Sequence, residues 1–480
     1  MFDTHLNYYL RRALSTHVLL QEALVYKTIL LETLLSRDSD TLRTEEIPFR
    51  YPDGLPPVNL RFIVPRPGSS NQGHPALRFD VVDLGEKRVN SWSVSLPPSR
   101  RANTLFKTYV RRYKPAYLRM RLPFMGLGIP HCSHMSKTGY ICASNGFYNY
   151  VIDTHTNTAR IFPEDYLSAE PMHYSKQGNF SSDSAYWYFV RWPLAGWANL
   201  IDGKADSVPC QVGRVSLEEL EEEVLLEIDY QEETHEIACS PDDRYAVFCT
   251  FKQELCVPYP RGSFFSSRPG YRLSHQAGIR PQQLVTMDLK RRLHWLTALP
   301  APVIGHHVFD PDDPAVFYSS AHNIVFHQMN AILEGPATLF KLRIVDGHTS
   351  IEGKYSDDRF MRIFQHEVFH HKGVTYLAVM SYPRYLYILR AADMSLYRRI
   401  DVSPEQEIEC RDGGNALCEK SKGIYFTVNA SEDGRYIVMG SDVEFLMYDM
   451  GSDELISLGG HLPRGFGIGE SIPHTRTCGE

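Results

Sequence analysis

Histidine is the residue type in this sequence whose positions most suggest chemistry. Of the 20 His, several come directly before short apolar segments that contain Tyr or Phe and that recur along the chain. These are His131, His134, His173, His235, His306, His307 and His366. Imidazole is a ligand for Fe, Mn and Zn. Histidines from separate repeats can share one metal ion only if the fold brings those repeats around a common axis.

One histidine-rich segment has the letters of a known zinc motif. Residues 366–371 read HEVFHH, which contains H-E-x-x-H. That motif binds zinc on a helix, because a helix places residues four apart on one face. Here the surrounding residues favour a strand that ends at a turn at 372–373. A strand sends His366 and His370 to one face and Glu367 to the other, so we do not expect zinc binding by this motif.

Composition limits the classes of function. The chain has 480 residues, a net charge of −7 and 43% hydrophobic residues, which is typical of a soluble globular protein. No apolar run approaches the roughly 18–20 residues of a membrane span. A pI of about 6.3 argues against a nucleic-acid binder. The nine Cys are scattered, which favours free thiols in a reducing compartment. With no secretory signal, we expect a cytoplasmic location.

A repeated pattern predicts the fold that could bring the histidines together. Six segments have a small or polar turn followed by Tyr or Phe in an apolar strand. The aromatic residues are Tyr140, Tyr186, Tyr245, Phe317, Tyr376 and Tyr436. A second pair of strands often follows, as at 149–162 and 445–458, and residues 77–96 supply strands of a further blade. We predict an all-β, seven-bladed β-propeller, with six or eight blades as alternatives. First strands line the channel of a propeller, so histidines there converge.

Two segments depart from this strand pattern. Leucines recur at helical spacing over residues 5–36. We therefore predict an N-terminal helical extension at 1–45 and a propeller at 46–480, closed by N- and C-terminal strands. The helical segment packs on the propeller, or it contacts a membrane surface or a protein partner. The acidic residues 217–229 are expected to form a solvated helix or loop.

Four segments resemble the carotenoid cleavage oxygenases, which are seven-bladed propellers with a non-haem iron held on the axis by four histidines. The segments are EPMHYS, ETHEIACSPDDRYAVF, LHWLTALPAPVIGHHVFDPDD and HLPRGFGIGESIPHTRT. The resemblance implies the Fe(II) ligands His173, His235, His306 and His474. It makes His307 an alternative to His306. Among the outer positions that orient the ligands, it places Glu419 at one carboxylate position and Asn145 at another.

A second resemblance involves some of the same residues. Residues 305–322 and 365–379 resemble oligogalacturonate-lyase-type propellers, which carry a histidine-bound Mn site. In that case His306, His322 and His366 are the residues of interest.

Three functions are consistent with these observations. The first is a metal-dependent enzyme acting on an elongated apolar or aromatic substrate in the channel, which the first resemblance makes an oxidative alkene cleavage at Fe(II). The second is an isomerase or cyclase without a metal, in which Tyr and His act as acid and base. The third is a propeller that binds a protein partner and has no enzymatic activity. No specific catalytic residue is assigned, and neither enzymatic function involves nucleic acid.

Overall fold

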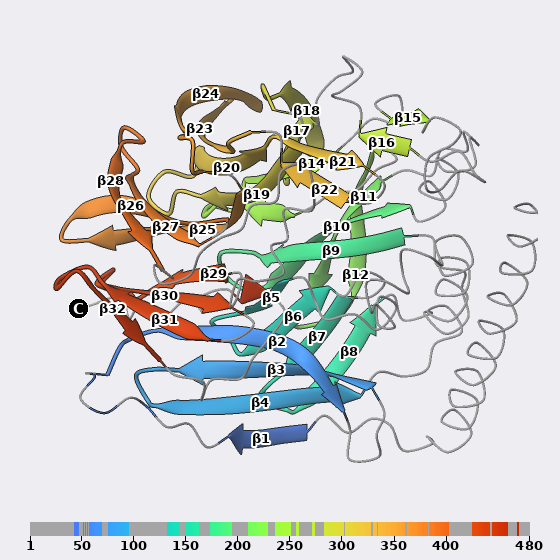
Figure 1. Cartoon of the computed structure of the whole chain (residues 1–480). Coiled ribbons are helices and arrows are strands. Elements are labelled where there is room, and N and C mark those ends of the chain that lie inside the picture. The colour runs from blue at the N-terminus through green and yellow to red at the C-terminus, as the bar shows by residue number, and fades with distance from the viewer. Residues whose placement is uncertain are drawn as a thin grey trace, which may run out of the picture.

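The fold is seen in a computed structural model of the chain (Figure 1). The structure describes residues 43–47, 51, 53, 55, 57–69, 75–95, 132–144, 149–162, 173–193, 210–228, 236–250, 256–258, 271–273, 283–301, 303–327, 330–333, 335–360, 362–382, 384–402, 425–441, 444–458 and 468–469. Every regular element in these ranges is a β-strand. Among the described residues there is no helix that could span a membrane.

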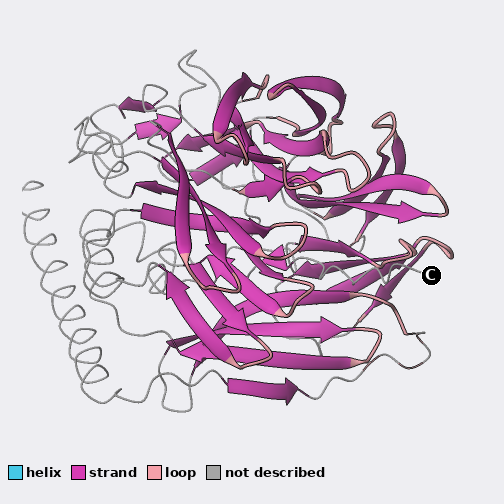
Figure 2. Ribbon diagram, turned by 180° about the vertical axis from the view of Figure 1, so that it is seen from behind, coloured by secondary structure: helices cyan, strands magenta, loops and turns pink. Residues whose placement is uncertain are grey.

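Seven antiparallel sheets, which we call blades 1 to 7, are arranged around a central axis (Figures 1 and 2). From the channel outward, blade 1 consists of β2 (Arg61–Ser69), β3 (Pro75–Asp83), β4 (Arg88–Ser95) and β1 (Arg43–Ile47). Blade 2 consists of β5 (Cys132–Met135), β6 (Tyr140–Ser144), β7 (Asn149–Asp153) and β8 (Thr158–Phe162). Blade 3 consists of β9 (His173–Phe180), β10 (Tyr186–Pro193), β11 (Cys210–Ser216) and β12 (Glu222–Ile228).

The remaining blades follow in the same order. Blade 4 consists of β13 (Ile237–Cys239), β14 (Tyr245–Thr250), β17 (Gln283–Asp288) and β18 (Leu293–Ala298). Blade 5 consists of β19 (Val303–Phe309), β20 (Val316–His322), β23 (Thr338–Val345) and β24 (His348–Tyr355). Blade 6 consists of β25 (Arg362–His371), β26 (Val374–Tyr382), β27 (Tyr385–Arg390) and β28 (Leu396–Asp401). Blade 7 consists of β29 (Tyr425–Ala430), β30 (Tyr436–Ser441), β31 (Phe445–Asp449) and β32 (Glu454–Ser457).

Three pairings lie outside this four-strand plan. Strands β15 (Cys256–Pro258) and β16 (Tyr271–Leu273) form a hairpin between the second and third strands of blade 4. Strands β21 (Ile324–His327) and β22 (Asn330–Leu333) form another at the same place in blade 5. Strand β33 (Ile468–Gly469) pairs in parallel with β5 and also contacts β2 and β29. It therefore completes the inner ring of strands between blades 7 and 2.

The predicted all-β, seven-bladed propeller is confirmed, and the repeated turn explains why the sequence forms it. The six aromatic residues that marked the repeats all lie in the second strands of blades 2 to 7. In blade 3, Ser181 Oγ accepts a hydrogen bond from the backbone N–H of Tyr186 at 2.9 Å and donates to Asp183 at 2.6 Å. Equivalent serines are Ser136, Ser240 and Ser431. These local bonds fix the turn that reverses the chain between the first and second strands.

Three sequence predictions differ from the structure or lie outside it. Strand β1 spans the predicted boundary between residues 45 and 46, because it pairs with β4 as the outer strand of blade 1. Residues 1–42 of the predicted helical extension lie outside the described residues. The acidic segment 217–229 was expected to be a helix or loop, and this is wrong: it contains a turn and strand β12. Four of the Cys for which free thiols were predicted form no disulfide: Cys142, Cys210, Cys239 and Cys249.

The two faces of the propeller differ in their connections. Because successive strands are antiparallel, the first-to-second and third-to-fourth connections of blades 2 to 7 lie on one face. They are short, as at 136–139 in blade 2 and 372–373 in blade 6. Where the structure describes them, the strand ends that lead from one blade to the next, such as the end of β4 and the start of β5, lie at the other face. We call the face that carries the short connections the short-turn face.

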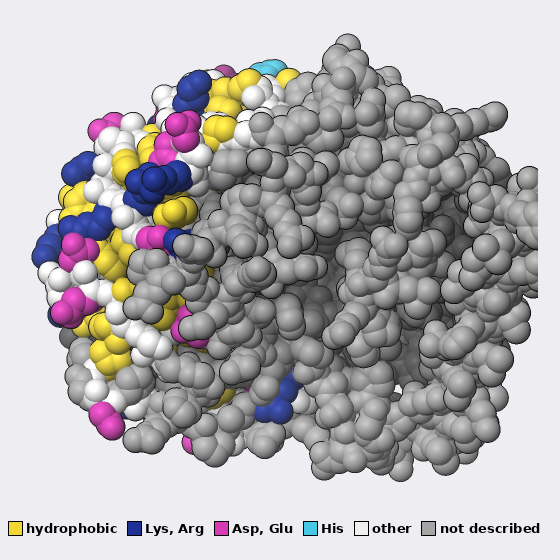
Figure 3. Space-filling model, viewed as in Figure 1, with side chains coloured by type: hydrophobic (Ala, Val, Ile, Leu, Met, Phe, Trp, Pro, Cys, Tyr) yellow, Lys and Arg dark blue, Asp and Glu magenta, His cyan; other side chains and the backbone are white. Residues whose placement is uncertain are grey.

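Charged side chains on the rim are mixed in sign. Figure 3 shows Lys and Arg interspersed with Asp and Glu over the described part of the visible surface. One exposed pair in blade 1 joins Arg88 to Glu86 at 2.5 Å. Exposed pairs of this kind contribute little to stability individually. The fold therefore depends on the apolar contacts between blades, such as the cluster of Phe62, Val82, Val438 and Met447 between blades 1 and 7.

A glycine on the short-turn face tests the packing between blades 6 and 7. Gly434 has φ +63°, and a Cβ there would collide with the His370 carbonyl oxygen and the Phe369 ring. We expect Gly434→Ala to lower the free energy of unfolding by about 3 kcal/mol or more, from backbone strain plus overpacking. Gly373 also has a positive φ, of +75°, but nothing lies within 4 Å of the place that an added methyl group would occupy. Gly373→Ala should cost about 1 kcal/mol. Equal shifts in the denaturant midpoints of the two variants would contradict the predicted contact.

Candidate functional site

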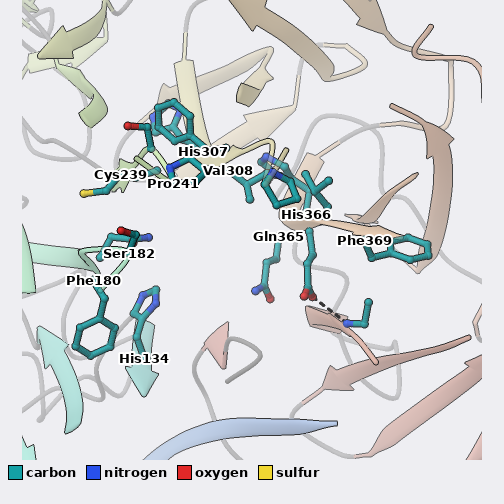
Figure 4. A pocket seen from close by; sticks show the side chains of 18 of the residues that line it. His134, Phe180, Ser182, Cys239, Pro241, His307, Val308, Gln365, His366 and Phe369 are labelled. Carbon is teal, nitrogen blue, oxygen red and sulfur yellow. Dashed lines mark hydrogen bonds between the residues drawn. The ribbon is translucent and has the colours of Figure 1, made fainter. Parts of the chain in front are cut away.

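A cavity of about 610 Å³ lies in the channel between the first strands of the blades and reaches the short-turn face. Its inner part is lined by residues of, or next to, the first strands of blades 2 to 7. Exposed turn residues line its outer part: Lys137, Ser182, Pro241, Pro311 and Glu432. We call these five residues the mouth. Figure 4 shows His134 and Phe180 on one side of the cavity, and Gln365 and His366 on another.

A bulge in β19 gives blade 5 two adjacent histidines in the cavity. The register of β19 against β20 shifts between Ile304 and His307. Within the bulge, the backbone N–H of His306 donates to Ser320 Oγ at 2.8 Å instead of to a backbone carbonyl. A Cβ on Gly305 would collide with this same hydroxyl, so the bulge requires glycine here. His306 and His307 both line the cavity as a result.

A short polar contact deep in the cavity joins two blades. Nδ1 of His306 lies 2.6 Å from Oε2 of Glu236, which immediately precedes β13 of blade 4. His306 is 8% exposed and Glu236 is 4% exposed. A carboxylate can only accept a hydrogen bond, so Nδ1 carries the proton of this contact, and the neutral tautomer with this proton has its lone pair on Nε2. This tautomer suits a histidine that ligates a metal or accepts a proton through Nε2.

Two further imidazoles of the cavity are neutral. Burial, together with the nearby His366 and His306, lowers the pKa of His307 to about 3. Burial and His306 likewise lower the pKa of His366 to about 3. Nε2 of His366 donates to the carbonyl oxygen of Tyr318 at 3.3 Å, so its lone pair is on Nδ1. That Nδ1 and the Nε2 of His307 are buried and have no hydrogen-bond partner.

The expected alternation of the HEVFHH segment is confirmed in β25. His370 contacts Asp312 of blade 5 at 3.3 Å, on the same side as the contact of His366 with Tyr318. Glu367 turns to blade 7, where its Oε2 accepts the backbone N–H of Ala430 at 2.9 Å. Gln365 accepts the N–H of Val428 in the same way, at 3.0 Å. These two side chains satisfy the channel-facing edge of β29, to which no described strand is hydrogen-bonded.

The structure describes the side chains of some predicted site residues and not of others. His306, His307 and His366 come together in the cavity. His322 is buried in β20, with Nε2 at 3.2 Å from Ser320 Oγ, and is not among the described cavity-lining residues. His173 is the first residue of β9, an innermost strand. The remaining predicted residues lie outside the described residues: His235, His474, Asn145, Glu419 and His131.

Glu236 is the functional candidate that the sequence did not single out. It follows His235 in the ETHEIAC segment and precedes the first strand of a blade, a position already of interest for its histidines. Its partner His306 is 70 residues away along the chain. The position of Glu236 was therefore visible in the sequence, but its pairing was not.

The chemistry of the cavity fits a transition metal in part. Neutral imidazoles with orphaned nitrogens are what such an ion requires. In the part of the chain that the structure describes, however, no three His, Cys, Asp or Glu side chains form a group that could hold a metal ion. A complete site therefore needs ligands from residues whose side chains are not described.

Comparison with known proteins adds solved structures of low similarity. No family model matches the chain, and no curated protein matches it. A variant of the apocarotenoid oxygenase from Synechocystis is similar over 93% of this chain and 98% of its own, with 10% identity and a TM-score of 0.49. The Cps50 (Swd1) β-propeller domain from Myceliophteria thermophila matches over 71% and 89%, with 12% identity and a TM-score of 0.43. A chain of a mitotic checkpoint complex matches over 72% and 81%, with 8% identity and a TM-score of 0.41. Function is therefore argued from the side chains of the cavity.

Proposed function

We propose that this protein is a metal-dependent enzyme that acts on a small molecule in the central channel. The observation that carries the proposal is the Glu236–His306 pair at 2.6 Å, beside two neutral imidazoles with unpartnered nitrogens. A carboxylate on Nδ1 orients a ligating imidazole and raises its basicity. His306 is thus the described residue best prepared to ligate an ion, and His173, His235 and His474 are the proposed remaining ligands.

The proposed ion is Fe(II), with Mn as the alternative. Bound Fe(II) would supply the O₂ chemistry of an oxidative alkene cleavage. The chain's own contribution is the orientation of His306 by Glu236 and a partly apolar cavity wall. Phe180, Val308 and Val368 contribute to that wall. It suits an elongated apolar or aromatic substrate.

A specific observation also favours a second candidate, an isomerase or cyclase that needs no metal. The Glu236–His306 pair is itself a general base, because Nε2 can accept a proton while the carboxylate stabilises the resulting imidazolium. In this case His306 is a catalytic residue that removes a proton from a substrate in the cavity.

Metal analysis of the purified protein distinguishes the two candidates. After anaerobic loading with Fe(II) and removal of free ion, we expect about one Fe per chain. His306→Gln should lower this content at least tenfold. His348→Gln, at an exposed position on β24, is the matched control and should leave it unchanged. A metal content near zero in the loaded wild-type protein would contradict the proposed metal-dependent function. Turnover that continues in the presence of a chelator would then support the isomerase or cyclase that needs no metal.

A further inference from the structure

The outer strand of blade 4, β18, differs in composition from the outer strands of the other blades. It reads LHWLTA and contains no Lys, Arg, Asp or Glu. Each of the others contains at least one of these residues: β1 (RTEEI), β8 (TARIF), β12 (EEVLLEI), β24 (HTSIEGKY), β28 (LYRRID) and β32 (ELIS). Charged side chains on an edge strand oppose pairing with a further strand. Strand β18 lacks this protection.

The outer edge of β18 is regular and open to solvent. Its six residues pair with β17 in one unbroken register, from Leu293 opposite Asp288 to Ala298 opposite Gln283. No described strand is hydrogen-bonded to the other edge of β18. Leu293 is 52% exposed and Leu296 is 36% exposed. Side chains alternate along a strand, so these two leucines lie on opposite faces of the blade and an added strand would cover apolar surface on both.

Contacts with blade 5 fix the position of β18. A Cβ on Gly347, in the turn between β23 and β24, would lie 2.4 Å from the Trp295 ring, so this ring packs directly on the turn. The centroids of the Trp295 and His348 rings are 6.1 Å apart. The hydroxyls of Thr286 in β17 and Thr349 in β24 are 2.7 Å apart. A strand that is already fixed can accept a partner strand at a small cost in conformational entropy.

The turn that leads into β18 is basic. Lys290, Arg291 and Arg292 are consecutive and all three are exposed. Arg292 pairs with Glu223 of β12 at 2.5 Å. Arg291 lies 4.0 Å from the carboxylate of buried Asp288, and no ion pair joins Lys290 to a described carboxylate. This end of β18 therefore favours a partner that carries negative charge.

We propose that β18 binds an extended peptide segment of a protein partner as an added antiparallel strand. The segment has β-branched or aromatic residues, followed by Asp or Glu at its C-terminal end. Antiparallel pairing places that end beside Lys290 and Arg291. Backbone hydrogen bonds supply the affinity and the neighbouring side chains supply the specificity. The site is at the rim beside β24, separate from the cavity (Figure 1).

A second copy of this chain is a poorer occupant of the same edge. Antiparallel pairing of two β18 strands would place Leu299 and Pro300 of one copy beside the basic turn of the other. Neither residue carries a negative charge, so the exposed cations of the turn would gain no partner.

Selection of phage-displayed random peptides on the full-length protein tests the proposal. We expect the enriched peptides to have a β-branched or aromatic segment followed by Asp or Glu. The Kd of an enriched peptide is then measured by fluorescence anisotropy. Leu296→Lys should raise this Kd at least about tenfold, because it places a charge on the edge and removes apolar surface. Lys290→Glu combined with Arg291→Glu should raise it about tenfold and weaken its dependence on ionic strength.

Hydrogen exchange of the complex shows whether the peptide pairs with the backbone. An added strand accepts hydrogen bonds from amides of 293–298, so the exchange of this segment should slow when the peptide binds. Unchanged exchange with a bound peptide would contradict strand addition.

Matched variants show whether the effects belong to β18. Leu396→Lys makes the same change at a 39% exposed position in the outer strand of blade 6 and should leave the Kd unchanged. Lys372→Glu reverses an exposed charge in a turn of that blade and should also have no effect. Leu293→Lys changes the opposite face of β18 and gives a second reading if Leu296→Lys fails to fold.

Three results would overturn the proposal. The first is a selection that enriches no peptide, and the second is an enriched peptide that binds the β18 variants as tightly as the wild type. The third is a dimer in analytical ultracentrifugation that Leu296→Lys dissociates, since a second copy would then occupy the edge.

Discussion

Removing the carboxylate of Glu236 is expected to weaken both the fold and the metal site. In Glu236→Ala, the Nδ1–H of buried His306 loses its 2.6 Å acceptor. Leaving a buried polar group unpaired costs about 1–3 kcal/mol, and the cavity left by the side chain adds to this. We expect the free energy of unfolding to fall by about 3 kcal/mol. Co(II) affinity should fall 10- to 100-fold, because the imidazole is no longer oriented.

Glu236→Gln separates these two effects. Its amide oxygen can still accept from Nδ1, so we expect less than about 1 kcal/mol of destabilisation. Its neutral amide does not raise the basicity of His306, so the loss of Co(II) affinity should persist. Denaturant midpoints measure the first quantity and Co(II) titration measures the second. An unchanged affinity in both variants would show that Glu236 has a structural role alone.

Acid is expected to destabilise the metal-free protein through His366. Its pKa is about 3 in the folded protein, where burial is the largest cause and His306 adds to it, against 6.5 in the unfolded chain. Between these values the unfolded chain binds a proton that the folded protein does not, so stability falls as the pH falls below 6.5. At pH 5 this amounts to about 2 kcal/mol for one group, at 1.36 kcal/mol for each unit of pH difference.

His366→Gln should remove that part of the pH dependence. Glutamine can still donate to the carbonyl of Tyr318 but does not titrate in this range. We expect the variant to lose about 2 kcal/mol less than the wild type between pH 7 and pH 5, measured by urea unfolding with a chelator present. His348→Gln is the exposed control and should follow the wild-type curve. Parallel curves for wild type and His366→Gln would mean that His366 is protonated in the folded protein at pH 5.

The fold could be predicted from the sequence because its signals are local. A Ser, an Asp two residues later and a Tyr form one turn, as at Ser240, Asp242 and Tyr245, and this turn recurs along the chain. Strand β12 was missed because its signal is not local. Its glutamates pair with arginines of other strands of blade 3: Arg191 of β10 with Glu222 at 2.9 Å, and Arg214 of β11 with Glu223 at 2.8 Å. Without knowledge of those partners, the composition of an acidic segment does not tell an outer strand from a helix or a loop.

The candidate site could be predicted only in part, for a similar reason. The position of His306 before a repeat indicated a first strand facing the channel, and this is confirmed. The bulge that brings His307 into the same cavity depends on Ser320 of the next strand. The pairing of His306 with Glu236 depends on how two blades meet. Such contacts follow from tertiary packing, and the spacing of residues along the chain does not predict them.

The parallel pairing of β33 with β5 bears on the order in which the protein can fold. Blades 2 to 7 each form from one continuous stretch of chain and pack on the next blade in sequence, so they can assemble progressively during synthesis. Strand β33 must cross from blade 7 to blade 2 before the ring is complete. Contacts between such distant segments form slowly. Until they form, blades 1 and 7 expose apolar faces and unpaired strand edges, so ring closure is the step at which aggregation competes with folding.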